Sequence, residues 1–144
     1  MANLQDVAKC FLCLDEANSG DGISNLKLQK LVYYAQGFYS ALFEKPLFRN
    51  SILAWAHGPV VDELYQTYKC YGRDHIPVPT DFNNKSLTKD ELELIEEVFD
   101  VYGQYSAWKL RNMTHEESPW LVHEAQADVI PLPEITEFFK NKIN

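Results

Sequence analysis

The stretch LKLQKLVYYAQGFYSA, residues 26–41, predicts the helix around which the rest of the protein is organised. Its apolar side chains recur at spacings of three and four residues, which is the period of an α-helix. They are Leu28, Leu31, Val32, Ala35, Phe38, Tyr39 and Leu42. These side chains occupy much of the circumference, so we expect other helices to pack around it. Gly37 predicts that one neighbour passes close by, because Gly in an exposed helix costs about 1 kcal/mol relative to Ala.

Capping residues and chain breakers predict further helices on both sides of this one. The residues that can begin a helix are Asn3, Ser24, Pro59 and Thr88. The residues that can end or separate helices are the NSGDG run at 18–22, Gly72 and Gly103. Glu91 lies three residues after Thr88, which is the spacing of a capping box. Two shorter helices are expected, over residues 106–113 and from residue 133 onward.

The fold class that follows is mostly α, with one compact domain of about six helices over residues 1–144. Residues 46–57 are the exception, since they contain Pro46 and the run SILAWA without a period of 3.6. We expect a short strand or hairpin there. Neither an internal repeat nor a linker rich in Pro, Gly or Ser divides the chain.

The charge of the protein disfavours nucleic acid as a partner. The net charge is −8, and residues 1–80 carry seven Lys or Arg against eight Asp or Glu, whereas residues 81–144 carry six against thirteen. Such a field repels phosphate backbones, so we expect no nucleic-acid binding. An acidic surface of this kind suits a basic protein partner.

No part of the sequence indicates a membrane or a secreted protein. No apolar run approaches the roughly 18 residues that a membrane span needs, and the start MANLQDVAKC lacks the pattern of a signal peptide. We therefore expect a cytoplasmic protein that does not bind membranes. The odd cysteine count agrees, and the CFLC run at 10–13 has no second pair with which to complete a zinc site.

Two further stretches contain residue types that are typical of catalytic sites. MTHEESPW, residues 113–120, begins like a zinc-protease HExxH motif, but Pro119 stands where the second His is needed. Thr114 or His115 then ends a helix, Glu116 and Glu117 are exposed charges, and Trp120 packs in the core. Templates for nucleotide binding and for a hydrolase nucleophile are absent. We expect no metal, no cofactor and no catalytic residues. An enzyme that uses His57 and His115 in one pocket is the alternative from a different class.

AWAHGPVVDELY, residues 54–65, is explained as a helix start. Pro59 at the first helical position loses no hydrogen bond, and Gly58 before it avoids helical geometry. His57 then lies where the helix begins, and Trp55 anchors this segment in the core.

Three blocks together carry a resemblance to a known family. LKLQKLVYYAQG at 26–37, AWAHGPVVDELY at 54–65 and MTHEESPW at 113–120 occur in the order and at the separations typical of the SocA-like or Panacea antitoxin domain. The resemblance covers roughly residues 4–140. It implies a small helical domain that acts by binding protein, without catalytic activity or cofactor.

Members of this family are typically antitoxins that neutralise a toxin encoded beside them. The resemblance therefore implies a cognate toxin as the partner, which the domain type does not name. One branch delivers its toxin to an AAA+ protease, so a proteolytic adaptor is an alternative mechanism. No segment precedes residue 4 that resembles a DNA-binding region, so we do not expect the chain to repress its own operon. The oligomeric state is left open.

The resemblance carries over to individual residues. The candidates for contact with the partner are Lys27, Gln29, Lys30, Tyr34, His57 and His115. Lys27, Gln29 and Lys30 are included because the pattern gives them no role in the core. The residues expected to have a structural role are Trp55, Gly58, Pro59 and Trp120.

Overall fold

The structure is a computed structural model that describes residues 1–143. Its helices are α1 Leu4–Ala17, α2 Asn25–Phe43, α3 Asp62–Tyr68, α4 Lys89–Tyr102, α5 Ala107–Thr114, α6 Ser118–His123 and α7 Leu132–Ile143. The strands are β1 Ile52–Trp55, β2 Gly58–Val60 and β3 Val129–Ile130. Short 3₁₀ turns occur at Lys69–Tyr71 and Asn84–Ser86. The predicted fold class is thus confirmed, with a small antiparallel sheet in the order β2-β1-β3.

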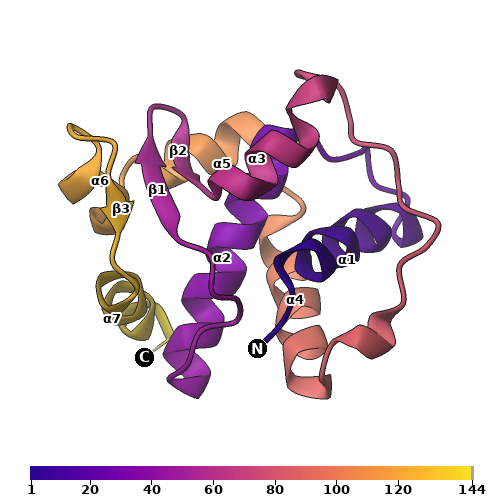
Figure 1. The fold of residues 1–144 in the computed structure, drawn as a ribbon, viewed down its shortest axis with the longest axis horizontal. Helices are drawn as coiled ribbons and strands as arrows, with labels where there is room; N and C mark the ends of the chain where they lie inside the picture. The colour runs from indigo at the N-terminus through magenta and orange to yellow at the C-terminus, as the bar shows by residue number, and fades with distance from the viewer. Residues whose placement is uncertain (144) are drawn as a thin grey trace.

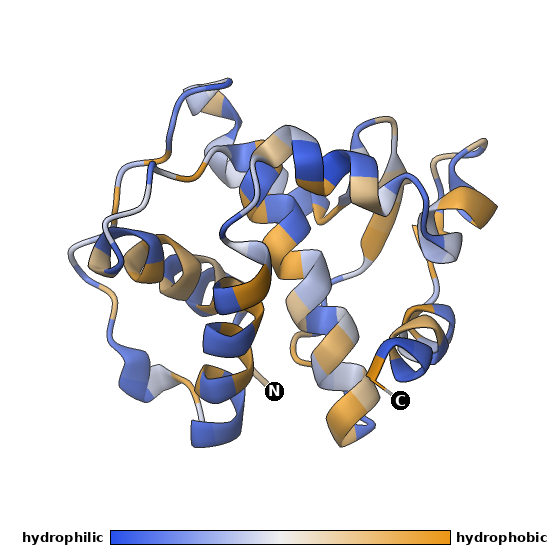
Figure 2. Ribbon diagram, turned by 180° about the vertical axis from the view of Figure 1, so that it is seen from behind, coloured by the Kyte–Doolittle hydropathy of each residue, from blue (hydrophilic) through white to orange (hydrophobic). Residues whose placement is uncertain are grey.

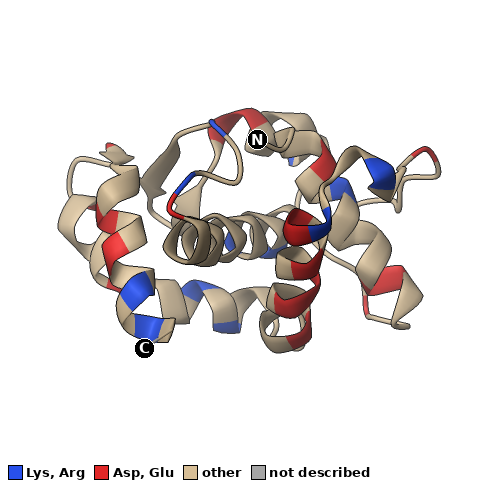
Figure 3. Cartoon of the chain, turned by 90° about the horizontal axis from the view of Figure 1, so that it is seen from below, with Lys and Arg blue, Asp and Glu red and all other residues tan. Residues whose placement is uncertain are grey.

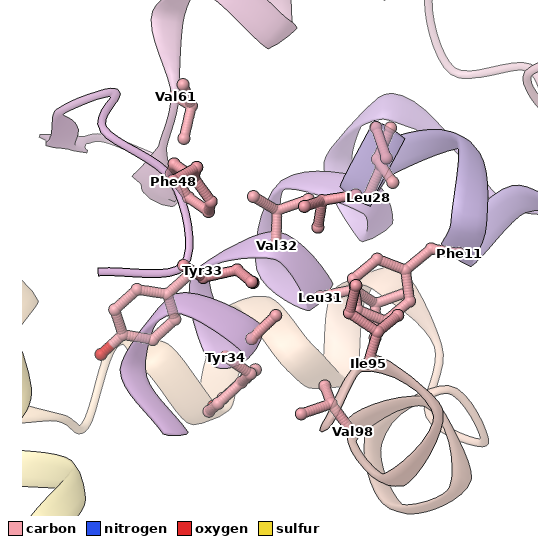
Figure 4. Packing of buried hydrophobic residues seen from close by; sticks show 14 of the residues in the cluster. Phe11, Leu28, Leu31, Val32, Tyr33, Tyr34, Phe48, Val61, Ile95 and Val98 are labelled. Carbon is pink, nitrogen blue, oxygen red and sulfur yellow. The ribbon is translucent and has the colours of Figure 1, made fainter. Parts of the chain in front are cut away.

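Helix α2 runs through the middle of the molecule, and α1, α4, α5 and α7 pack around it (Figure 1). The expected close approach at Gly37 is made by α7. A Cβ atom added at Gly37 would lie 2.2 Å from the Phe139 ring, which is fully buried. The aromatic and aliphatic side chains of α2 meet those of α1 and α4 in the core, as the cluster around Leu31, Tyr34 and Ile95 shows (Figure 4).

The predicted helix starts at Asn3, Ser24 and Thr88 are confirmed. The Asn3 side chain accepts a hydrogen bond from the Gln5 amide, and the Ser24 side chain accepts one from the Lys27 amide. Thr88 and Glu91 form the complete capping box. Along α4, hydrophobic and hydrophilic bands alternate as an amphipathic helix requires (Figure 2).

The prediction that Pro59 begins a helix is wrong. Gly58 and Pro59 lie in β2, where Pro59 is paired with Ala54 of β1, and α3 begins only at Asp62. Gly58 has a φ of +107°, a value that side chains rarely allow, and this permits the tight turn through Ala56 and His57. Pro59 can lie in β2 because β2 is an edge strand, where a missing amide hydrogen breaks no ladder.

The structure differs from the sequence-based expectations at two other places. Trp55 does not anchor the core but is half-buried, with its ring 5.3 Å from that of Tyr65, which is also partly exposed. A seventh helix, α6, was not predicted; it starts at Ser118 and has Pro119 in its first turn, where a missing amide hydrogen breaks no helical bond. No helix within residues 1–143 is long and apolar enough to cross a membrane.

Candidate functional site

The polar residues of the first block are inside the molecule rather than on its surface. Gln29 and Lys30 have 2% and 1% of their surface exposed, and Tyr34 is fully buried. The expectation that Gln29 and Lys30 have no role in the core is therefore wrong. The helical pattern leaves them outside the apolar positions of α2, but irregular segments of the chain fold over that side of the helix and bring backbone groups that need hydrogen-bond partners.

Gln29 joins α2 to the start of α3. Its side-chain oxygen accepts a hydrogen bond from the Val61 amide at 2.9 Å, and its side-chain nitrogen donates to the Asn25 side chain at 3.0 Å. Asn25 in turn donates to the Tyr65 carbonyl at 3.2 Å. Buried backbone groups outside helices must be paired, so Gln29 holds a segment that has no regular hydrogen-bonding pattern.

Lys30 holds the hairpin that β1 and β2 form. Its Nζ donates to the Pro59 carbonyl at 3.1 Å, and a Cβ added at Gly58 would lie 2.6 Å from the Lys30 side chain. Burial, and next the nearby charge of Arg111, lower the pKa of Lys30 to about 7. A buried ammonium without a carboxylate partner is disfavoured by its lost hydration. In the folded protein Lys30 therefore titrates close to physiological pH rather than staying fully charged.

Two tyrosines of α2 share one carboxylate. The hydroxyls of Tyr33 and Tyr34 donate to the two Glu117 oxygens at 3.0 and 2.8 Å. Burial raises the pKa of Glu117, and the two tyrosine hydrogen bonds oppose that rise. The expectation that Glu117 is an exposed charge is wrong. Only Glu116 of that pair faces solvent, because the chain turns inward at Glu117 before α6 begins.

The third block closes against the second through aromatic rings. The His115 ring stacks on the Trp120 ring, with centroids 3.9 Å apart and planes 4° apart, and Trp120 Nε1 donates to the Trp55 carbonyl at 2.7 Å. His115 also caps the end of α5. The three blocks therefore meet along one side of α2, between the helices and the hairpin. We call the buried polar residues that join them there, Gln29, Lys30, Tyr33, Tyr34 and Glu117, the polar seam.

The remaining candidates lie at the edges of this seam. His57 is exposed in the turn between β1 and β2, close enough to His115 to lower its pKa. Lys27 is half-buried, and its Nζ donates to the Gly103 carbonyl at 2.7 Å, beside an open polar hollow of about 600 Å³. Its charge is therefore directed at the C-terminal end of α4.

A family model matches the chain over this seam. The model for "Antitoxin SocA-like, Panacea domain" matches residues 28–121, from α2 to α6. The chain belongs to this family. Antitoxin SocA of Caulobacter vibrioides (strain NA1000 / CB15N) is 32% identical over 127 residues, which cover 76% of this chain. The match covers 64% of that relative's length. No solved structure matches the chain.

The matched segment of the Panacea domain contains most of the seam and omits two packing helices. Helix α1 and all of α7 lie outside the match. Gln29, Lys30, Tyr34 and Glu117 lie within it and are buried with internal partners. Within the matched segment, these four residues hold irregular segments of the fold.

The polar side chains at this site of the Panacea domain form hydrogen bonds with other groups of the same chain. Among residues 1–143, no group of three or more His, Cys, Asp or Glu side chains is placed to hold a metal ion. The site residues that sequence reasoning missed are Tyr33 and Glu117. The adjacent tyrosines at 33 and 34 gave a signal for Tyr33, but Glu117 looked like any surface glutamate because only the tertiary fold buries it.

Proposed function

We propose that this protein is the antitoxin of a toxin–antitoxin pair and neutralises its cognate toxin by binding it directly. The observation that carries the proposal is membership of the SocA-like antitoxin family, supported by the similarity to Antitoxin SocA. The chain spans 64% of the length of that relative, so the antitoxin function of this chain is a proposal.

Binding fits the chemistry of the molecule better than catalysis does. The buried polar side chains of the seam point at backbone groups and at one another, where they stabilise the fold. The surface in contrast exposes large apolar side chains, such as Trp108 at 58%, Leu121 at 49% and Val122 at 62%. Exposed aromatic and aliphatic groups are the usual anchors of protein interfaces.

The test is growth of cells that induce the reading frame adjacent to this gene, with and without this protein. We expect the frame alone to stop growth and co-expression to restore it. Restoration should need about one copy of this protein per toxin and leave the toxin level unchanged, because a binding antitoxin is consumed in the complex. An adjacent frame that is harmless, or a toxic frame that this protein fails to neutralise, would contradict the proposal.

The same cultures separate binding from the other mechanisms. An adaptor that delivers the toxin to an AAA+ protease would shorten the toxin half-life, and deletion of the protease would abolish the rescue. An enzyme that modifies the toxin would rescue growth at far less than one copy per toxin. Toxin half-life and the ratio of the two proteins, both measured by quantitative blotting, distinguish these cases.

A further inference from the structure

Helix α5 presents one stripe of side chains to the surface. Trp108, Arg111, Asn112 and His115 are spaced at i, i+3, i+4 and i+7, so they lie along one side of the helix. We call these four residues the α5 stripe. Trp108 is 58% exposed, whereas Leu110 on the inner side of the same helix is fully buried. The exposed His57 of the hairpin turn adjoins the His115 end.

The side chains of the α5 stripe are held in place by one another. The Arg111 guanidinium carbon lies 4.3 Å from the centre of the Trp108 ring, and one Arg111 terminal nitrogen donates to the Asn112 side chain at 2.9 Å. The His115 ring is fixed on Trp120. A surface whose side chains are already ordered loses less entropy when a partner binds.

Two polar side-chain nitrogens of the α5 stripe have no hydrogen-bond partner. Arg111 Nε and His115 Nε2 are shielded from solvent, and neither is paired within residues 1–143. An unpaired shielded polar atom is unfavourable in the isolated protein, and a partner whose docking shifts these side chains would relieve it. The Arg111 guanidinium is charged and therefore favours an acceptor that is an anion.

The local charge also favours an anion, against the net charge of the molecule. Besides burial, the groups that lower the pKa of His115 are Arg111, Lys30 and His57. A hydrogen bond with the Ala56 backbone raises it, and no carboxylate is among the groups that act on it. Arg111 and the neighbouring Lys109 form no salt bridge within the described chain. Figure 3 shows basic residues on α5 and near the end of α7, whereas acidic residues gather along α4.

We propose that the α5 stripe, with His57 at its end, is the docking surface for an acidic segment of the toxin. This inference rests on the proposed antitoxin function. Trp108 would pack against the segment as the apolar anchor, and Arg111 would pair with a carboxylate, since Trp and Arg dominate binding energy at interfaces. Nucleic acid is the other common ligand of basic and aromatic side chains. A strand of phosphates extends beyond the α5 stripe into the field of a protein with a net charge of −8, which repels it, whereas a short acidic segment contacts the stripe alone.

The test measures the affinity of the purified protein for the product of the adjacent reading frame by isothermal titration calorimetry. Trp108→Ala and Arg111→Glu should each weaken binding about tenfold or more. The matched controls are Leu42→Ala and Lys45→Glu, which change an exposed apolar group and an exposed charge at the far end of α2. Both controls should bind as the wild type does. An acidic toxin residue changed to Lys should restore binding to Arg111→Glu.

The outcomes separate this inference from the function on which it rests. If the wild type binds and both α5 variants bind equally well, the docking surface is wrong and the antitoxin function stands. Loss of binding in Glu96→Lys or Glu97→Lys on α4, with the α5 variants unaffected, would show a basic toxin surface on the acidic helix and overturn the inference. If the wild type neither binds nor rescues, both proposals fail. Circular dichroism of each variant verifies that it is folded.

Discussion

The polar seam on α2 and the α5 stripe use similar residue types for opposite purposes. In the seam, Gln29, Lys30 and Tyr34 are buried, and their polar atoms are paired inside the chain. In the stripe, Trp108 is exposed and Arg111 keeps an unpaired donor. A substitution at Gln29, Lys30 or Tyr34 should therefore act on folding, and one at Trp108 or Arg111 should act on binding.

The largest loss of stability is expected at Glu117, where two buried hydroxyl donors share one carboxylate. Glu117→Ala leaves the Tyr33 and Tyr34 hydroxyls without their partner, and each unsatisfied buried group costs about 1–3 kcal/mol. We expect the free energy of unfolding to fall by about 3 kcal/mol or more, as measured by urea denaturation. Glu117→Gln, which keeps an acceptor oxygen, is the control and should lose clearly less. Equal losses in the two variants would contradict the shared-acceptor description.

The pH dependence of stability should reveal the lowered pKa of Lys30 in the folded protein. Its folded pKa of about 7 is below its unfolded value, so the unfolded chain binds one more proton between those two values. Stability therefore rises with pH in this window, by up to about 1.4 kcal/mol per pH unit. Lys30→Met removes this contribution.

The measurement is the difference between wild type and Lys30→Met from pH 7.5 to 9, because other groups titrate in both proteins. Burial raises the pKa of Cys10 to about 12, which acts in the opposite direction above the usual thiol range. The wild type should gain about 2 kcal/mol relative to the variant across this range. Parallel curves would show that Lys30 is not buried as described.

A smaller effect is expected where α7 crosses α2. Gly37→Ala places a methyl group against the Phe139 ring, and inserting a methyl into a packed core costs about 1–3 kcal/mol. The higher helix propensity of Ala returns about 1 kcal/mol of this. We expect a net loss of about 1 kcal/mol, measured as a shift in the urea midpoint. A stabilised variant would show that the two helices lie further apart.

The smallest effect on stability is expected in the α5 stripe. Trp108→Ala removes a mostly exposed ring, and surface substitutions usually change stability by less than about 0.5 kcal/mol. Thermal unfolding should show almost no change in Tm. A loss comparable with that of Glu117→Ala would mean that the indole belongs to the core.

The sequence predicted the helices and the short strand within residues 46–57, but it placed a helix start where the second strand of the hairpin lies. Apolar periodicity and capping residues located α1, α2 and α4, because those signals are local. The Gly58-Pro59 step was misread because Pro is favoured at both a helix start and an edge strand, and only the pairing with Ala54 decides between them.

The candidate site was misjudged for a similar reason. Burial of Gln29, Lys30 and Glu117 depends on segments far away in the sequence that fold over α2. A helical pattern assigns polar residues to the outside unless such a cover is known. Trp108 and Arg111 were not singled out, because a Trp in a short helix is indistinguishable from a core residue until its exposure is known.

The most direct test measures toxin affinity for Tyr34→Phe and Trp108→Ala side by side, at a temperature where both variants are folded. Tyr34→Phe removes one hydroxyl from the seam, so it should be less stable yet bind the toxin as the wild type does. Trp108→Ala should be as stable as the wild type and bind about tenfold more weakly or worse. The reverse result, with affinity lost in Tyr34→Phe and kept in Trp108→Ala, would contradict the division between a folding seam and a binding stripe.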